Sequence, residues 1–207
     1  TLIFSLARYR QVMDAYLSGL ERRVAGGATL ADVFSVASFF VSRVDNKVDA
    51  AIGKALQGLP PGAAARAELE SFLGKAAIAN ARLAYAEFMA VTASPRFAAL
   101  RARGANVQRP LWASTGTKNP AYPDTLYVDE LIGPDTVNTM PPQTLVAFND
   151  HGRPAVTIAR DLDHARMLFD RLPKLGVPVD TLIDQLEPEG VAAFAASYDS
   201  LLATLET

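Results

Sequence analysis

The sequence predicts an α/β protein in which parallel strands are joined by crossover helices. Short apolar runs, typical of buried parallel strands, alternate with longer segments of helical periodicity. Several of these runs end in small polar residues, as expected where parallel strands deliver loops to one edge of a sheet. Parallel neighbours need a crossover connection, and a helix is the usual one. The alternation therefore favours repeated strand–helix units.

The composition is that of an ordinary globular protein. The chain has 207 residues, half of them hydrophobic and a fifth charged, which is enough for one sizeable core. The net charge of -2 gives no general attraction for nucleic acid. The sequence has no cysteine, which excludes disulfides and a cysteine nucleophile and fits a reducing cytoplasm. No apolar run approaches the roughly 20 residues of a membrane span.

Two strands are expected in the first half of the chain. Leu2–Ser5 is a strand-like run, and Val36–Val41 has the apolar character of a buried strand. Between them, apolar residues at helical spacing predict a helix over residues 6–24. Further helices are expected over residues 46–57 and, in an alanine-rich segment, over residues 64–91.

Two more strands are expected in the second half. Ser94 followed by Pro95 predicts the start of a helix, and the strand Val107–Ala113 comes next. Asp124 is expected to cap a short helix, and Thr136–Met140 is another strand-like run. From about Leu162 onward the pattern is helical.

Four strands are half of the eight that close a TIM barrel, a fold of about 250 residues. Because the chain opens on a strand-like run, we expect residues 1–207 to be the second half of one such barrel domain, truncated at its N-terminal side. Half a barrel would expose two strand edges, so it should need the missing N-terminal half for stability.

Ser38 and Arg43 are the first candidate site residues. They lie five positions apart, across the end of a predicted strand and its loop. In one interpretation the Ser38 hydroxyl contacts a substrate oxygen and the Arg43 guanidinium holds a phosphate. In the other, which the usual surface location of arginine favours, Ser38 is a small strand residue and Arg43 forms a surface ion pair with Asp45.

Ser114 and Lys118 flank Gly116 in a small polar loop after the strand Val107–Ala113. Because glycine has no Cβ, backbone N–H groups at Gly116 could approach an anion. The alternative is a solvated turn that Ser114 caps. A serine and a cation at two strand ends together favour a phosphate site, because barrel enzymes gather function at this edge.

The remaining polar residues give weaker signals. Asp45, Asp129 and Glu130 are candidate acids, for which a solvated surface is the favoured interpretation. His151 and His164 lack the partner spacing of a metal site. The sequence contains no Walker loop and no GxGxxG, HExxH or GxSxG motif.

Four stretches of the sequence resemble transaldolases, and together they span most of the chain: Thr1–Ser5, Ala37–Asp45, Gln108–Pro120 and Leu126–Pro141. The resemblance is to the bacterial subgroup that includes fused transaldolase/glucose-6-phosphate isomerase proteins. It implies a class I aldolase-type barrel that works without a cofactor in the cytoplasmic pentose phosphate pathway. A lysine forms a Schiff base with sedoheptulose 7-phosphate or fructose 6-phosphate, and a dihydroxyacetone unit passes to an aldose phosphate.

The resemblance also implies roles for individual residues. Thr1 is similar to the threonine that helps hold the catalytic water, although a β-branched strand residue needs no such role. Ser38 matches the serine that bonds the dihydroxyacetone hydroxyl. Arg43 and Ser114 match phosphate ligands.

The sequence departs from the family at two places. Gly116 stands where better-known transaldolases have an arginine, so Lys118 is the nearest cation to replace it. The family's Schiff-base lysine lies on the strand before the one that begins here, and no lysine of this chain matches it (Lys47, Lys54, Lys75, Lys118 and Lys174). We therefore expect this segment alone to be inactive. The alternative is a non-catalytic, sugar-phosphate-binding half-barrel. Neither nucleic acid nor membrane is an expected partner, and a homodimer stays open.

Overall fold

The computed structural model describes residues 1–205 and confirms an α/β fold built on a small parallel sheet. Three strands, β1 (Ser35–Phe40), β2 (Gln108–Ala113) and β3 (Val137–Thr139), lie side by side in that order. The predicted strand at Leu2–Ser5 is reduced to one parallel bridge, from Ile3 to Phe39 of β1. Four segments in chain order, three of them full strands, are consistent with a partial TIM barrel.

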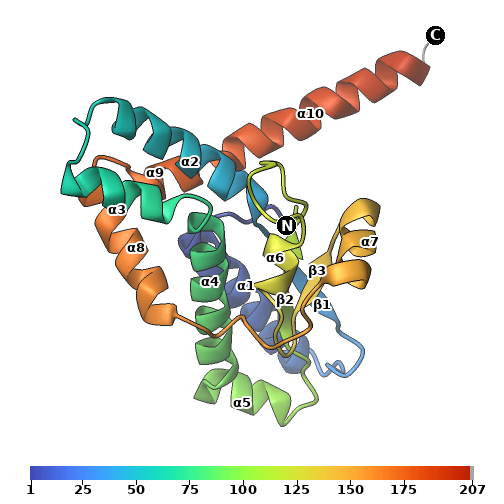
Figure 1. Ribbon diagram of the computed structural model, residues 1–207. Coiled ribbons are helices and arrows are strands. Elements are labelled where there is room, and N and C mark those ends of the chain that lie inside the picture. The colour runs from blue at the N-terminus through green and yellow to red at the C-terminus, as the bar shows by residue number, and fades with distance from the viewer. Residues whose placement is uncertain (206–207) are drawn as a thin grey trace.

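Helices fill most of the remaining sequence. Their bounds in the described part of the chain are α1 Leu6–Ala25, α2 Ser42–Gln57, α3 Ala64–Phe72, α4 Ala76–Thr92, α5 Pro95–Arg101, α6 Leu126–Asp129, α7 Pro142–His151, α8 Leu162–Lys174, α9 Val179–Asp184 and α10 Leu186–Leu205. In Figure 1, α10 leads away from the body of the molecule toward the C-terminus.

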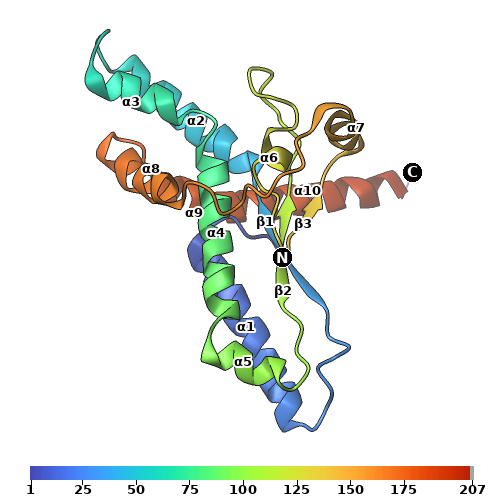
Figure 2. The ribbon, with the colours of Figure 1, turned by 60° about the horizontal axis from the view of Figure 1, so that its bottom comes forward.

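One face of the sheet carries the core. Figure 2 shows α1 and α4 together on one side of the three strands. Phe39 of β1 and Trp112 of β2 are completely buried there, with ring centroids 6.0 Å apart and edge to face. The Trp112 indole nitrogen donates a hydrogen bond to the carbonyl oxygen of Leu131, 3.1 Å away, so its one polar group is satisfied. The strands therefore use their alternate residues to pack against the helices.

The opposite face of the sheet is open. Val36 of β1, which points the other way from Phe39, is 44% exposed, and Arg109 and Thr139 of the neighbouring strands are also exposed. Parallel sheets are normally covered on both faces. This face therefore lacks the cover that a parallel sheet usually has.

The structure corrects three predicted helix boundaries. Helix α2 begins at Ser42 rather than at residue 46, so Arg43 and Asp45 lie in its first turn and not in a loop. The predicted helix over residues 64–91 is two helices, because Gly74 between α3 and α4 has a left-handed backbone with φ of +70°. Asp124 does not cap α6: Thr125 occupies the cap position, without a side-chain hydrogen bond.

Ser94 caps α5 as the sequence predicts, and the cap can be tested. Its Oγ accepts a hydrogen bond from the backbone N–H of Phe97, 3.2 Å away, and Pro95 follows at the first helical position. We expect Ser94→Ala to lower the free energy of unfolding by about 1 kcal/mol, measured by urea denaturation. Ser197→Ala, inside α10, is the control and should change it by less than about 0.5 kcal/mol. Equal losses in the two variants would argue against a capping role.

Candidate functional site

The two strand ends predicted to form one site are directly connected. Ser42 follows β1, and its backbone N–H donates to the carbonyl oxygen of Ser114, which follows β2, at 3.1 Å. The side-chain oxygens of Ser42 and Ser114 are also hydrogen-bonded, 2.9 Å apart. Ser114 adopts a left-handed backbone with φ of +57°, which is uncommon for a residue other than glycine. The structure thus joins the segment of Arg43 to the segment of Lys118 through this serine pair.

Arg43 has no carboxylate partner among residues 1–205. Its guanidinium carbon lies 5.6 Å from the centre of the Phe40 ring, at the end of β1, in a cation–π contact. It lines an open cavity of about 390 Å³ together with Lys47 and Glu189, which form an ion pair with each other. The surface ion pair between Arg43 and Asp45 is therefore absent, and the Arg43 charge is available to an anion.

Thr1 and Ser38 are neighbours. The backbone N–H of Ser38 donates a hydrogen bond to Thr1 Oγ1 over 2.8 Å. Thr1 is exposed and Ser38 is partly buried on β1. The two residues that the family resemblance places near the reacting carbons are thus in contact.

Lys118 lies at the exposed part of the segment between β2 and α6, and it makes no hydrogen bond or ion pair within the described part of the chain. Packing explains why a glycine stands at position 116, which the sequence did not reveal. A Cβ there would lie only 3.0 Å from Cγ of Pro141. Thr115 beside it is fully buried, and its hydroxyl donates to the Asn138 side chain at 2.8 Å. The start of this segment is therefore fixed, while the Lys118 side chain is unpaired.

Asp45 is buried, so a solvated surface is the wrong interpretation for it. Only 1% of it is exposed, and its two carboxylate oxygens accept hydrogen bonds from the Ala77 backbone N–H and the Tyr127 hydroxyl, each at 2.7 Å. Burial raises the pKa of Asp45 to about 7, helped by the nearby Asp49 charge and opposed by these donors. Sequence reasoning missed this role because Ala77 and Tyr127 are distant in the chain.

Asp49, one helical turn after Asp45, is a second half-buried acid that the sequence did not single out. It accepts hydrogen bonds from the Gly74 backbone N–H at 3.0 Å and from the Tyr122 hydroxyl at 2.7 Å. Burial raises the pKa of Asp49, while the two donors oppose that shift. The i, i+4 spacing of the two acids on α2 was the available signal.

The other two candidate acids, Asp129 and Glu130, make contacts between elements of the fold. Asp129 accepts hydrogen bonds from the Thr125 hydroxyl and the Arg153 backbone N–H, each at 2.7 Å. Glu130 pairs with the buried Arg82 at 2.6 Å. Both acids therefore have structural contacts, while the Glu130 side chain keeps 39% of its surface exposed, in line with the predicted surface location.

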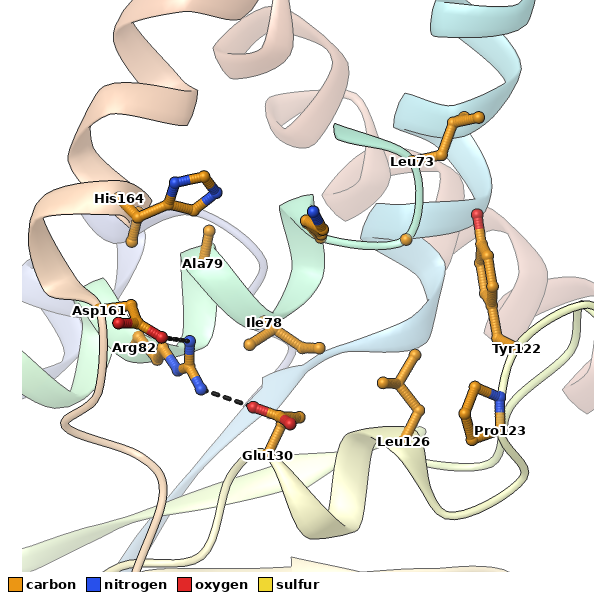
Figure 3. A pocket seen from close by; sticks show the side chains of 13 residues that line it. Leu73, Ile78, Ala79, Arg82, Tyr122, Pro123, Leu126, Glu130, Asp161 and His164 are labelled. Atoms are coloured by element: carbon orange, nitrogen blue, oxygen red, sulfur yellow. Dashed lines mark hydrogen bonds and ion pairs between the residues drawn. The ribbon is translucent and has the colours of Figure 1, made fainter. Parts of the chain in front are cut away.

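Arg82 forms one wall of a separate cavity of about 540 Å³ between α4, α6 and α8 (Figure 3). His164 and the candidate acid Glu130 lie at the same cavity, which is lined by none of the residues expected to bind substrate: Thr1, Ser38, Arg43, Ser114 and Lys118. His151 lies elsewhere, between Asp124 and Asp150 at 2.9 and 3.0 Å, and these carboxylates raise its pKa. Among residues 1–205, no group of three metal-ligating side chains is arranged to hold a metal ion.

The helices of the described residues include none that is long and apolar enough to span a membrane.

Comparison with protein families shows which family the chain belongs to. The model of the family described as Transaldolase/Fructose-6-phosphate aldolase matches residues 1–205. The chain belongs to this family.

Individual members of the transaldolase family are similar along the whole chain. A protein named Transaldolase from Frankia alni is 51% identical over 206 residues, 99% of this chain and 53% of the relative. Transaldolase 2 of Streptomyces avermitilis is 52% identical over 207 residues, 100% of this chain and 53% of the relative. The Transaldolase of Mycolicibacterium smegmatis is 52% identical over 203 residues, 98% and 52% of the two chains. This chain spans about half the length of these curated relatives.

Proposed function

We propose that this chain is the phosphate- and hydroxyl-binding part of a transaldolase that moves a dihydroxyacetone unit between sugar phosphates. The observation that carries the proposal is the Ser42–Ser114 connection, which joins the segments of Arg43 and Lys118 at one edge of the sheet. Arg43 would hold the substrate phosphate with Ser114, and Lys118 would replace the arginine that other family members have. Ser38 would bond the dihydroxyacetone hydroxyl, and Thr1 would hold the catalytic water.

The covalent step would use a lysine outside this chain. In that step the amine condenses with the substrate ketone and water leaves, and the Schiff base then accepts the electron pair as the carbon–carbon bond breaks. A barrel places such a lysine on a strand, and none of the three strands here contains one. The lysines lie on helices or in connections: Lys47, Lys54, Lys75, Lys118 and Lys174. This supports the proposal that the segment alone is inactive.

The open face of the sheet supports a half-barrel. The first half of the barrel would come from the part of the relatives that this chain does not span. It would cover the exposed residues of this face, Val36, Arg109 and Thr139. A homodimer is the other way to cover apolar surface of this kind. We further propose that the protein belongs to the bacterial subgroup related to the fused isomerase proteins and acts in the pentose phosphate pathway of the cytoplasm.

A chimera tests the proposed function. In it, this chain replaces the matching segment of Streptomyces avermitilis transaldolase 2, which supplies the other half. We expect the chimera to transfer dihydroxyacetone from fructose 6-phosphate to an aldose phosphate, while the chain alone does not. Borohydride with fructose 6-phosphate should add a covalent adduct to the chimera, and peptide mapping should place it outside the 207 residues of this chain.

Two outcomes would contradict the proposal. Transfer by the chain alone would show that the covalent lysine is one of its own. A chimera that unfolds cooperatively, binds inorganic phosphate and yet forms no adduct would favour the alternative function, a non-catalytic half-barrel that binds sugar phosphates.

A further inference from the structure

One face of α2 contacts the start and the end of the segment between β2 and α6. Ser42, Asp45 and Asp49 are spaced i, i+3 and i+7, so their side chains lie on the same side of the helix. Ser42 bonds Ser114 at the start of the segment, as described above. Asp49 bonds Tyr122 near its end, and Asp45 bonds Tyr127 of α6, each at 2.7 Å. Arg43 lies on the first turn of the same helix.

The contact of Tyr122 is closely fitted. Its hydroxyl donates to Asp49 Oδ2, while its ring lies against Gly74, where an added Cβ would be only 2.7 Å from the ring. Figure 3 shows the Tyr122 side chain running along α2, above Pro123 and Leu126. Asp49 also accepts from the Gly74 N–H, so one carboxylate holds the tyrosine and the turn that it packs on.

Lys118 lies between the fixed points of this segment. Before it, Thr115 is fully buried and bonded to Asn138. After it, the Tyr122 backbone N–H donates to the carbonyl oxygen of Asn119 at 3.1 Å, and the Tyr122 hydroxyl reaches α2. The backbone of Lys118 is thus restrained on both sides, while its ammonium has no partner in the described chain.

We propose that Tyr122 is a positioning residue for the substrate phosphate, which holds the Lys118 segment against α2 at a fixed place relative to Arg43. A flexible lysine binds as a point charge, so its backbone position decides whether it reaches an anion that Arg43 also holds. Release of Tyr122 from Asp49 would let the segment move and would reduce the share of molecules in which both cations meet the phosphate. The inference rests on the proposed function for its ligand, a phosphate ester.

The test is a double-mutant cycle in the chimera, with inorganic phosphate as a competitive inhibitor of transfer. Tyr122→Phe removes only the hydroxyl, and we expect the inhibition constant of phosphate to rise about fivefold with kcat changed less than twofold. Lys118→Ala should weaken phosphate by a similar factor. In the Lys118→Ala background, Tyr122→Phe should have no further effect, because the residue that it positions is gone.

Tyr16→Phe is the matched control. The Tyr16 hydroxyl also donates one hydrogen bond, to the Asn106 carbonyl oxygen at 2.8 Å, but Asn106 precedes β2 at the other end of the sheet. This variant should leave phosphate inhibition unchanged. Equal weakening by Tyr16→Phe, or additive effects of Tyr122→Phe and Lys118→Ala, would overturn the positioning role.

Amide hydrogen exchange separates this inference from the proposed function. Tyr122→Phe should speed exchange of the amides at positions 121 and 122, which are hydrogen-bonded to Asn119, at least tenfold and leave α4 unchanged, whether or not the chimera transfers dihydroxyacetone. An active chimera in which the variant changes neither exchange nor phosphate inhibition would refute the positioning role alone. An inactive chimera with faster exchange in this segment would refute the proposed function and keep the mechanical part of the inference.

Discussion

Replacing Arg43 with alanine should raise the KM of the chimera for phosphorylated substrates about 30-fold. A hydrogen bond to a charged group contributes about 1.5–3 kcal/mol, and each 1.4 kcal/mol is tenfold in affinity. Arg43 is suited to this role because no carboxylate among the described residues neutralises it. The Phe40 ring, 5.6 Å from its guanidinium carbon, holds it at the end of β1. Steady-state kinetics with fructose 6-phosphate as donor give the measurement.

Two controls distinguish the loss of a phosphate contact from a general loss of substrate binding. The same variant should change KM for free dihydroxyacetone less than threefold, because that donor has no phosphate. Lys47→Ala removes a neighbouring cation of α2 that is already paired with Glu189, and it should change either KM less than threefold. If Arg43→Ala weakens phosphorylated and unphosphorylated donors equally, Arg43 does not bind phosphate.

The sequence predicted the elements that depend on local pattern. The apolar runs at β1 and β2 and the capped start of α5 could be found because burial and capping leave short-range signals. Leu2–Ser5 has the same strand pattern but makes a single bridge, because Ser5 already caps α1 and the extended run ends there.

In the candidate site too, features that follow from local pattern could be predicted, and features that depend on distant residues could not. The connection between the ends of β1 and β2, made by Ser42 and Ser114, follows from the parallel strands, so it could be predicted. The burial of Asp45 could not, because its partners Ala77 and Tyr127 lie 32 and 82 residues away. A charged residue near a helix start is usually solvated, and only the packing of α4 and α6 against α2 reverses that expectation.

Burial of Asp45 leads to the second large effect, which is on stability. The lost hydration raises the pKa of this carboxyl from 3.8 to about 7 in the folded protein. Between pH 4 and 7 the unfolded chain therefore releases a proton that the folded protein keeps. Rising pH then favours unfolding, so this residue lowers stability progressively across that interval and by a constant amount above it. The full cost is on the order of 4 kcal/mol.

Asp45→Asn should remove that pH dependence while keeping both hydrogen bonds. The amide oxygen can accept from the Ala77 N–H, and the amide nitrogen can donate to the Tyr127 hydroxyl. Urea denaturation of the chimera and its variant at several pH values gives the difference in free energy of unfolding, in which titrating groups that do not interact with Asp45 cancel. We expect the variant to gain stability relative to the parent from pH 4 to 7, reach a plateau of up to about 4 kcal/mol, and keep it at pH 8. Parallel curves over the whole range would mean that Asp45 is ionised in the folded protein, with the tyrosine and backbone donors fully compensating its burial.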